Sequence, residues 1–304
     1  MKRLLFSLGT VLLFILCLSR PSIAVSGASA GLALWYSSVL PALLPCMILS
    51  GYLTASGLFR RLPPSALALT VGWFCGYPMG AKTVASLWKK KRLSEFQGRR
   101  LLSLVGEPSP MFLSGFLCSG MLRIPPEKAL VYMLSVYLPA VIFFGIQTAA
   151  EARRARQTAS SLRTSLPGQK SPASDEHNGL GLFEESMTDS MILMAKIGIY
   201  LMLFTMLSYF LTSWSAHPVF QSLFPGILEM TSGTAFTIRA GLSERLTVSL
   251  CFSYAAFGGC SILAQTKSAL KGTPFSIRRI GWAKLLQAAG TFLMIYGFYP
   301  MLQR

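Results

Sequence analysis

Charged residues are scarce in this 304-residue chain, and the motifs typical of soluble enzymes are absent. Lys, Arg, Asp and Glu make up 13% of the sequence, against about 25% in soluble domains. The two histidines, His177 and His217, have no cysteine, aspartate or second histidine at metal-ligand spacing. No P-loop, G-x-G-x-x-G segment or Ser/His/Asp grouping is present. We therefore expect neither an enzyme nor a metal site, and no cofactor.

Cysteine pairs are also missing. The six cysteines lie singly inside apolar segments, with no C-x-x-C spacing, at positions 17, 46, 75, 118, 251 and 260. A disulfide framework needs cysteines in loops at regular spacing. We interpret these residues as small hydrophobic side chains of the interior.

Long apolar runs are what the sequence does contain. Hydrophobic residues make up 52% of the chain, and the mean hydropathy is +0.52. A membrane-spanning helix needs about 20 mostly apolar residues. Runs of this kind occupy 4–19, 32–58, 129–149, 187–213 and 281–299. The sequence predicts an all-α polytopic membrane protein, in which Pro41 and Pro45 kink the second run.

The net charge of +17 lies in short basic clusters beside the apolar runs. This placement follows the positive-inside rule, so we predict a multi-pass membrane protein with a cytoplasmic N-terminus. Such clusters attract anionic lipid, and we expect no nucleic-acid partner. The basic residues expected on the outer side are Arg20, Arg123, Lys128, Arg239, Arg245 and Arg304.

Residues 1–26 have a basic start, an apolar centre and small residues after it. This pattern fits a cleaved signal peptide, with Ala24 and Ala28 to Ala30 small enough for a cleavage site, as well as a retained helix. We expect a signal-anchor helix, because the apolar run continues through Leu18 without an obvious cleavage signal.

The rest of the chain divides into two membrane repeats, 27–150 and 187–304, joined by a flexible basic cytoplasmic linker at 151–186. The first repeat contains a re-entrant hairpin at 66–92, with basic residues at both ends and a Gly-Tyr-Pro turn in its middle. The second contains a hairpin at 217–243 that enters from the opposite side. Each hairpin is followed by a broken helix. This inverted repeat predicts a binding site between the halves, near mid-membrane.

Three charged residues within the membrane segments are candidates for this site. A carboxylate inside a bilayer costs about 2.5 kcal/mol or more, so Glu107 and Glu229 are functional hypotheses. Lys82 follows the turn of the first hairpin. Three alternatives stay open: Lys82 and Glu107 form a structural ion pair, Glu229 is hydrated at the outer surface, or Gly and Pro merely kink helices for close packing.

Four segments resemble the YlbJ-type sporulation integral membrane proteins, a family of the nucleoside-recognition, or Gate, domain group. They are LWYSSVLPALLPCMILSGYL (34–53), GYPMGAKTVASL (76–87), LSEFQGRRLLSLVGEPSPMFLSGFL (93–117) and, more weakly, FGGCSILAQ (257–265). The resemblance covers most of the chain from about residue 30, and its most specific part is Gly-Tyr-Pro-x-Gly-Ala-Lys. The chain departs from the family at Gly106-Glu107-Pro108-Ser109, where the family has neutral Asn and Ser residues.

The resemblance implies a sporulation protein of the bacterial plasma membrane that is related to nucleoside carriers. Together with the carboxylates, it gives the candidate substrate-binding residues Gly76, Tyr77, Pro78, Gly80, Lys82, Glu107, Ser109, Pro110, Glu229, Thr231, Ser232, Gly233 and Gln265. We expect a secondary transporter-like carrier of a small polar solute, coupled through Glu107 or Glu229 to H⁺ or Na⁺. The alternative is a non-transporting scaffold for spore-envelope assembly that recruits partners through 151–186. A homo-oligomer is compatible with either.

Overall fold

The computed structural model describes residues 2–57, 62–158 and 179–302, which form helices joined by turns, with no strand among them. Within these residues, four helical stretches are long and apolar enough to cross a membrane: Pro21–Ala55, Pro126–Ala150, Gly179–Thr212 and Glu244–Ala269. The prediction of an all-α membrane protein is therefore confirmed.

The N-terminal part contains a longer helix than the sequence predicts. α1 (Lys2–Ser19) ends before Arg20, and α2 (Pro21–Leu34) runs through a π-helical turn, η1 (Trp35–Val39), into α3 (Leu40–Ala55). The π turn directly precedes Pro41, whose ring and missing N–H disrupt the α-helical bonding pattern. The predicted start of this helix at residue 32 is therefore wrong.

Small residues explain why the helix begins early. Gly27 and Gly31 face α8 so closely that an added Cβ would lie 2.7 Å from the Cα of Met206 and 2.8 Å from that of Met202, respectively. This Gly-x-x-x-Gly spacing lets two membrane helices approach closely. The segment that looked like a signal-peptide tail is thus a helix-packing surface.

The first half continues with a helical hairpin, a broken helix and a long helix: α4 (Pro64–Cys75), α5 (Met79–Lys89), α6 (Glu95–Leu101), the π-helix η3 (Phe112–Leu122) and α7 (Pro126–Thr158). α6 starts with a capping box between Ser94 and Gln97. Residues 102–109 between α6 and the helix that contains η3 are irregular, so the break begins four residues before Gly-Glu-Pro-Ser-Pro.

The second half repeats this order: α8 (Gly179–Thr212), α9 (Pro218–Leu228), α10 (Met230–Arg239), α11 (Glu244–Phe257), α12 (Gly259–Ala269) and α13 (Ile277–Leu302). α8 begins inside the predicted linker. Ser186 is buried and donates to the carbonyl of Ile48 at 2.7 Å, and Phe183 packs edge-on against Tyr52. The prediction that 179–186 belong to a flexible linker is therefore wrong, and 159–178 lie outside the described residues.

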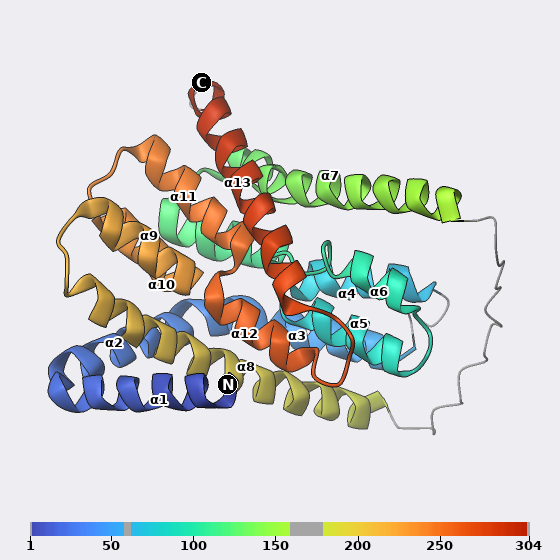
Figure 1. Ribbon diagram of the computed structural model, residues 1–304, viewed down its shortest axis with the longest axis horizontal. Helices are drawn as coiled ribbons and strands as arrows, with labels where there is room; N and C mark the ends of the chain where they lie inside the picture. Colours follow the sequence, from blue (N-terminus) through green and yellow to red (C-terminus); the bar gives the residue numbers. More distant parts are fainter. Residues whose placement is uncertain (1, 58–61, 159–178, 303–304) are drawn as a thin grey trace.

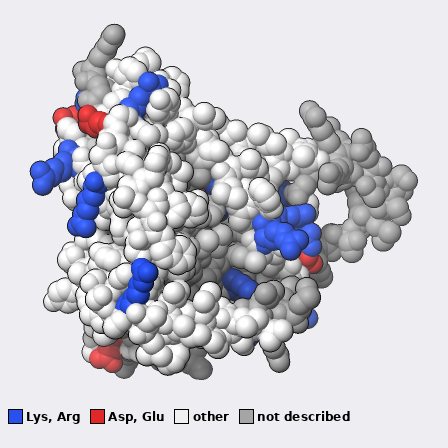
Figure 2. All heavy atoms as spheres, turned by 60° about the vertical axis from the view of Figure 1, so that its left-hand side comes forward, with Lys and Arg blue, Asp and Glu red and all other residues white. Residues whose placement is uncertain are grey.

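The two hairpins lie at opposite ends of the molecule. Figure 1 shows α4, α5 and α6 at one end, α9, α10 and α11 at the other, and α7 and α8 running along the long axis between them. Exposed leucine, isoleucine and valine side chains cover the outer faces of α7, α8 and α13. Figure 2 shows wide uncharged surface between a tight basic group and single basic residues. This surface suits contact with lipid tails.

Candidate functional site

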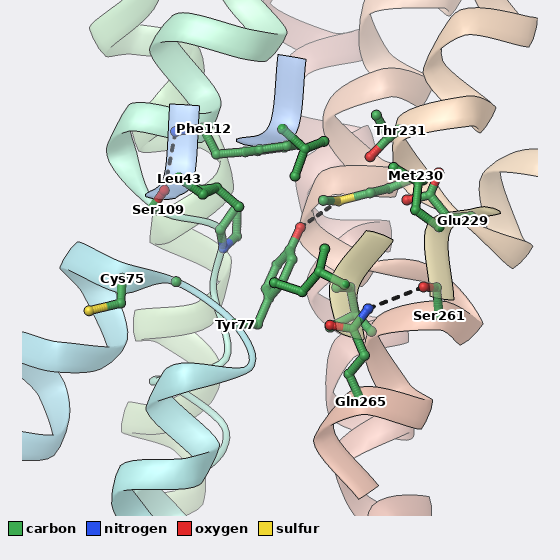
Figure 3. A pocket seen from close by; sticks show the side chains of 16 residues that line it. Leu43, Cys75, Tyr77, Ser109, Phe112, Glu229, Met230, Thr231, Ser261 and Gln265 are labelled. Carbon is green, nitrogen blue, oxygen red and sulfur yellow. Dashed lines mark hydrogen bonds between the residues drawn. The ribbon is translucent and has the colours of Figure 1, made fainter. Parts of the chain in front are cut away.

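A cavity lies where the irregular segments of both halves meet. Its wall contains the tip of the α4–α5 hairpin, the break before η3, the turn between α9 and α10, and the start of α12, with α3 and α8 completing it. Figure 3 shows the labelled residues Cys75, Tyr77 and Ser109 opposite Glu229, Ser261 and Gln265. The free volume is about 30 Å³, enough for a few waters only. In this conformation the cavity is too small for a larger solute.

Tyr77 crosses this cavity from the first half to the second. Its backbone follows Gly76, whose φ of 70° is readily adopted only by glycine. The Tyr77 hydroxyl contacts the sulfur of Met230 and lies 3.4 Å from the carbonyl oxygen of Ala255. The ring is therefore held between the halves, as Figure 3 shows.

Glu229 lines the opposite wall and is 3% exposed. Its backbone is extended where α9 ends, and its carboxylate accepts a hydrogen bond of 2.6 Å from the backbone N–H of Ser232 at the start of α10. A carboxylate at this position caps the helix and interacts favourably with the helix dipole. Within the described residues no cation pairs with Glu229. The alternative that Glu229 is hydrated at the outer surface is wrong.

Further polar groups face the cavity. Gln265 on α12 donates to Ser261 at 3.3 Å, while its buried Oε1 atom has no hydrogen-bond partner among the residues that the structure describes. Ser109 accepts a hydrogen bond from the N–H of Phe112 at 3.2 Å, directly before the helical residues that lead into η3. The ring of Phe112 and the side chains of Leu43 and Ile197 supply apolar wall. The cavity thus combines hydrogen-bond acceptors with aromatic and aliphatic surface.

Three side chains fix the irregular segment that forms one wall. Trp73 donates to the carbonyl of Leu104 at 3.2 Å, Tyr137 to that of Pro108 at 2.8 Å, and Gln287 to that of Ser103 at 2.8 Å. These donors come from α4, α7 and α13. An unpaired carbonyl inside a bilayer costs several kcal/mol, so these bonds explain how the break persists there.

Glu107 does not reach the cavity. It is fully buried and pairs with Lys284 of α13, which is 4% exposed. Lys82 lies on the surface and contacts Asp189 of α8 at 3.6 Å. The alternative of a Lys82–Glu107 ion pair is therefore wrong. The ion pair exists, but its cation is contributed by the last helix.

The structure brings about half of the sequence candidates together. Those in the cavity wall are Gly76, Tyr77, Ser109, Glu229, Thr231 and Gln265. Those outside it are Pro78, Gly80, Lys82, Glu107, Pro110, Ser232 and Gly233. Gly80 and Gly233 have a packing role instead. A Cβ on Gly80 would overlap the carbonyl oxygen of Val105 and the facing Gly72, and a Cβ on Gly233 would overlap the facing Gly226.

Four apolar wall residues were not predicted from the sequence: Val39 and Leu43 on the α2–α3 helix and Ile197 and Leu201 on α8. These residues occur in uniformly apolar stretches and carry no local signal. Lys284, Gln287 and Thr291 were also missed. All three are buried on α13, and their i, i+3, i+7 spacing marks one polar face on an apolar helix, so this face could have been found.

The helix breaks of the two halves have similar neighbours. In the first half, Gly76 at the hairpin tip packs on the irregular segment before η3. A Cβ added to Gly76 would lie 2.8 Å from the backbone nitrogen of Ser109. In the second half, Gly259 at the helix break packs on the hairpin turn, with an added Cβ 3.0 Å from the carbonyl oxygen of Leu228. In each half the hairpin tip therefore touches the broken helix that follows it.

Comparison with known proteins links the chain to sporulation. The chain is similar to a sporulation membrane protein. It is 23% identical over 322 aligned residues to "Sporulation integral membrane protein YlbJ" of Bacillus subtilis (strain 168), covering 91% of this chain and 78% of the relative. This similarity confirms the resemblance seen in the sequence. No family model matches the chain, and no solved structure matches it.

Proposed function

We propose that this chain is a sporulation-associated membrane carrier that binds a small polar solute in the central cavity. The observation that carries the proposal is the convergence of four irregular segments, two from each half, around a buried carboxylate that has no cation partner among the described residues. Interrupted helices at matching places in two halves are typical of transporter binding sites. The similarity to the Bacillus relative supports the link to sporulation.

The wall chemistry favours a solute with hydrogen-bond donors and a flat ring. Glu229 and the free Oε1 of Gln265 are acceptors, and Tyr77 and Phe112 offer ring faces for stacking. A nucleoside-like compound meets both requirements, as do other heterocycles with N–H groups. We infer this class from the chemistry and from the resemblance to the nucleoside-recognition group.

The closed cavity requires a movement before any such solute can enter. Ligand pockets usually have volumes of about 300–1,000 Å³, far above the 30 Å³ found here. Separation of the hairpin tips at the Tyr77–Met230 contact would enlarge the cavity. Opening alternately toward each end of the molecule would move the solute, and binding of H⁺ or Na⁺ at Glu229 would couple the movement to an ion gradient.

The test is a thermal-shift screen of the detergent-purified protein with nucleosides, nucleobases, amino acids and dicarboxylates, followed by Glu229→Gln. The substitution removes the charge but leaves an amide oxygen that can still accept from Ser232. A ligand at 100 times its Kd stabilises the folded state by about 2.7 kcal/mol. We expect a stabilising compound whose effect falls at least tenfold in apparent affinity in Glu229→Gln.

Glu184→Gln on α8 is the matched control, because Glu184 is exposed and outside the cavity, and it should keep the affinity of the unaltered protein. A hit that survives Glu229→Gln unchanged would place the solute elsewhere. If no compound shifts the melting curve and sporulation tolerates Glu229→Gln, the carrier proposal fails. The non-transporting scaffold would then be favoured, and capture of partners on 151–186 would test it.

A further inference from the structure

A second cavity opens at the basic end of the molecule, between α6, α7 and the start of α13. Its volume is about 280 Å³, and it shares no lining residue with the central cavity. We propose that this cavity binds the phosphate headgroup of an anionic phospholipid. The inference does not depend on a solute in the central cavity, so the two proposals can fail separately.

The charges of the wall favour an anion. The two charged residues that line the cavity are both arginines, Arg99 of α6 and Arg279 of α13. A guanidinium group can donate two parallel hydrogen bonds to phosphate oxygens. Arg99 already contacts Glu95 one turn earlier on the exposed surface, and exposed pairs of this kind are weak. A phosphate can therefore compete for Arg99.

The wall of this cavity also contains neutral hydrogen-bond donors. The Oε1 atom of Gln147 on α7 accepts from Ser103 at 3.2 Å. Its amide NH₂ group is not needed for that bond and could donate to a ligand. Ser276 also lines the cavity, directly before the first residue of α13. The first turn of α13 carries no acidic residue, so its positive end is not neutralised locally.

The surroundings favour a lipid over a free phosphate ion. Trp282 on α13 is 65% exposed and Phe96 on α6 is 49% exposed, and exposed aromatic residues are typical of the membrane interface. Leu286, one helical turn after Trp282 on α13, and Ile146, next to Gln147 on α7, present exposed apolar side chains. A phosphate in the cavity would therefore have a surface beside it on which acyl chains could lie.

Native mass spectrometry of the full chain in detergent tests the proposal, with phosphatidylglycerol, phosphatidylcholine and inorganic phosphate as probes. The test variant is Arg99→Gln/Arg279→Gln. The matched control is Lys90→Gln/Arg278→Gln, which removes the same charge from two exposed residues of the same end that do not line the cavity. A hydrogen bond to a charged group is worth roughly tenfold in affinity or more, and only the two cavity arginines would donate to the phosphate, so we expect phosphatidylglycerol binding to fall roughly tenfold or more in the test variant.

The expected pattern is tight binding of phosphatidylglycerol, weak binding of phosphatidylcholine, and little loss in the control. Equal losses in both double variants would show general attraction by the basic surface and overturn the proposal. Competition by inorganic phosphate at similar concentration would show a site for a soluble anion instead. Equal binding of both lipids would show that the headgroup charge is not recognised.

Discussion

Glu107 and Lys284 form the buried ion pair among the described residues, whereas Lys82–Asp189 and Glu95–Arg99 are exposed. Taking two charges out of water is costly, and their attraction repays that cost only when the pair is intact. Oε1 of Glu107 contacts Lys284, whereas the buried Oε2 has no hydrogen-bond partner in the described part of the chain. The pair therefore joins α13 to the irregular segment, and either residue alone would be a destabilising buried charge.

Removing one member of this pair should destabilise the protein strongly. We expect Lys284→Met and Glu107→Gln each to cost about 3 kcal/mol or more, and the double variant to cost clearly less than the sum of the two. Melting curves in detergent, followed by tryptophan fluorescence, measure the effect. Strictly additive costs would contradict a direct coupling between the two side chains.

The glycine pairs inside the hairpins act at the scale of the element. Gly72 faces Gly80 in the α4–α5 hairpin, and Gly226 faces Gly233 in the α9–α10 hairpin. Each pair brings the two arms into backbone contact, which shapes a hairpin thin enough to end beside the central cavity. Close packing of this kind replaces the hydrophobic driving force that is absent between helices in lipid.

An added methyl group at these contacts should separate the arms. A Cβ at position 233 would meet the backbone of the opposite arm, and a Cβ at position 80 would meet both the opposite arm at Gly72 and the carbonyl oxygen of Val105. Gly80→Ala and Gly233→Ala should therefore each cost about 1–3 kcal/mol. Gly145→Ala and Gly297→Ala are the controls, because a Cβ at either site meets nothing within 4 Å. Melting temperatures compare all four variants, and equal effects of test and control substitutions would rule out the proposed contact.

At the scale of the whole molecule, the structure gathers the basic residues of distant segments at one end. Lys89 at the end of α5 donates to the carbonyl of Lys271 after α12 at 3.0 Å, and Trp88 packs against Phe275. Arg239 ends α10 at the other end of the molecule. This separation agrees with the predicted membrane sides, although the orientation itself stays a prediction.

Cysteine labelling tests both the orientation and the opposite entry of the hairpins. The starting protein is a variant in which alanine replaces the native cysteines. Lys90→Cys and Arg239→Cys then mark the end of each hairpin that lies away from the central cavity, and both native side chains are exposed. We expect an impermeant maleimide to label Arg239→Cys in intact cells, and Lys90→Cys only after permeabilisation. Labelling of both from the same side would contradict the inverted repeat.

The sequence by itself determined the membrane class, the helical breaks and the two hairpins' residues. These features depend on local chemistry: apolar runs of bilayer length, and glycine or proline where the chain turns. It also identified Glu107 and Glu229 as unusual, because a carboxylate inside an apolar segment is costly wherever it lies.

Only the tertiary structure decided what each carboxylate does. Glu107 meets a lysine 177 positions away in the chain, and Glu229 faces a cavity whose wall includes α3 and α8. In a bilayer, a leucine facing lipid and a leucine facing a neighbouring helix have similar surroundings, so hydrophobic pattern cannot tell which side of a helix is buried. The position of the cavity follows from helix packing, which no single segment encodes.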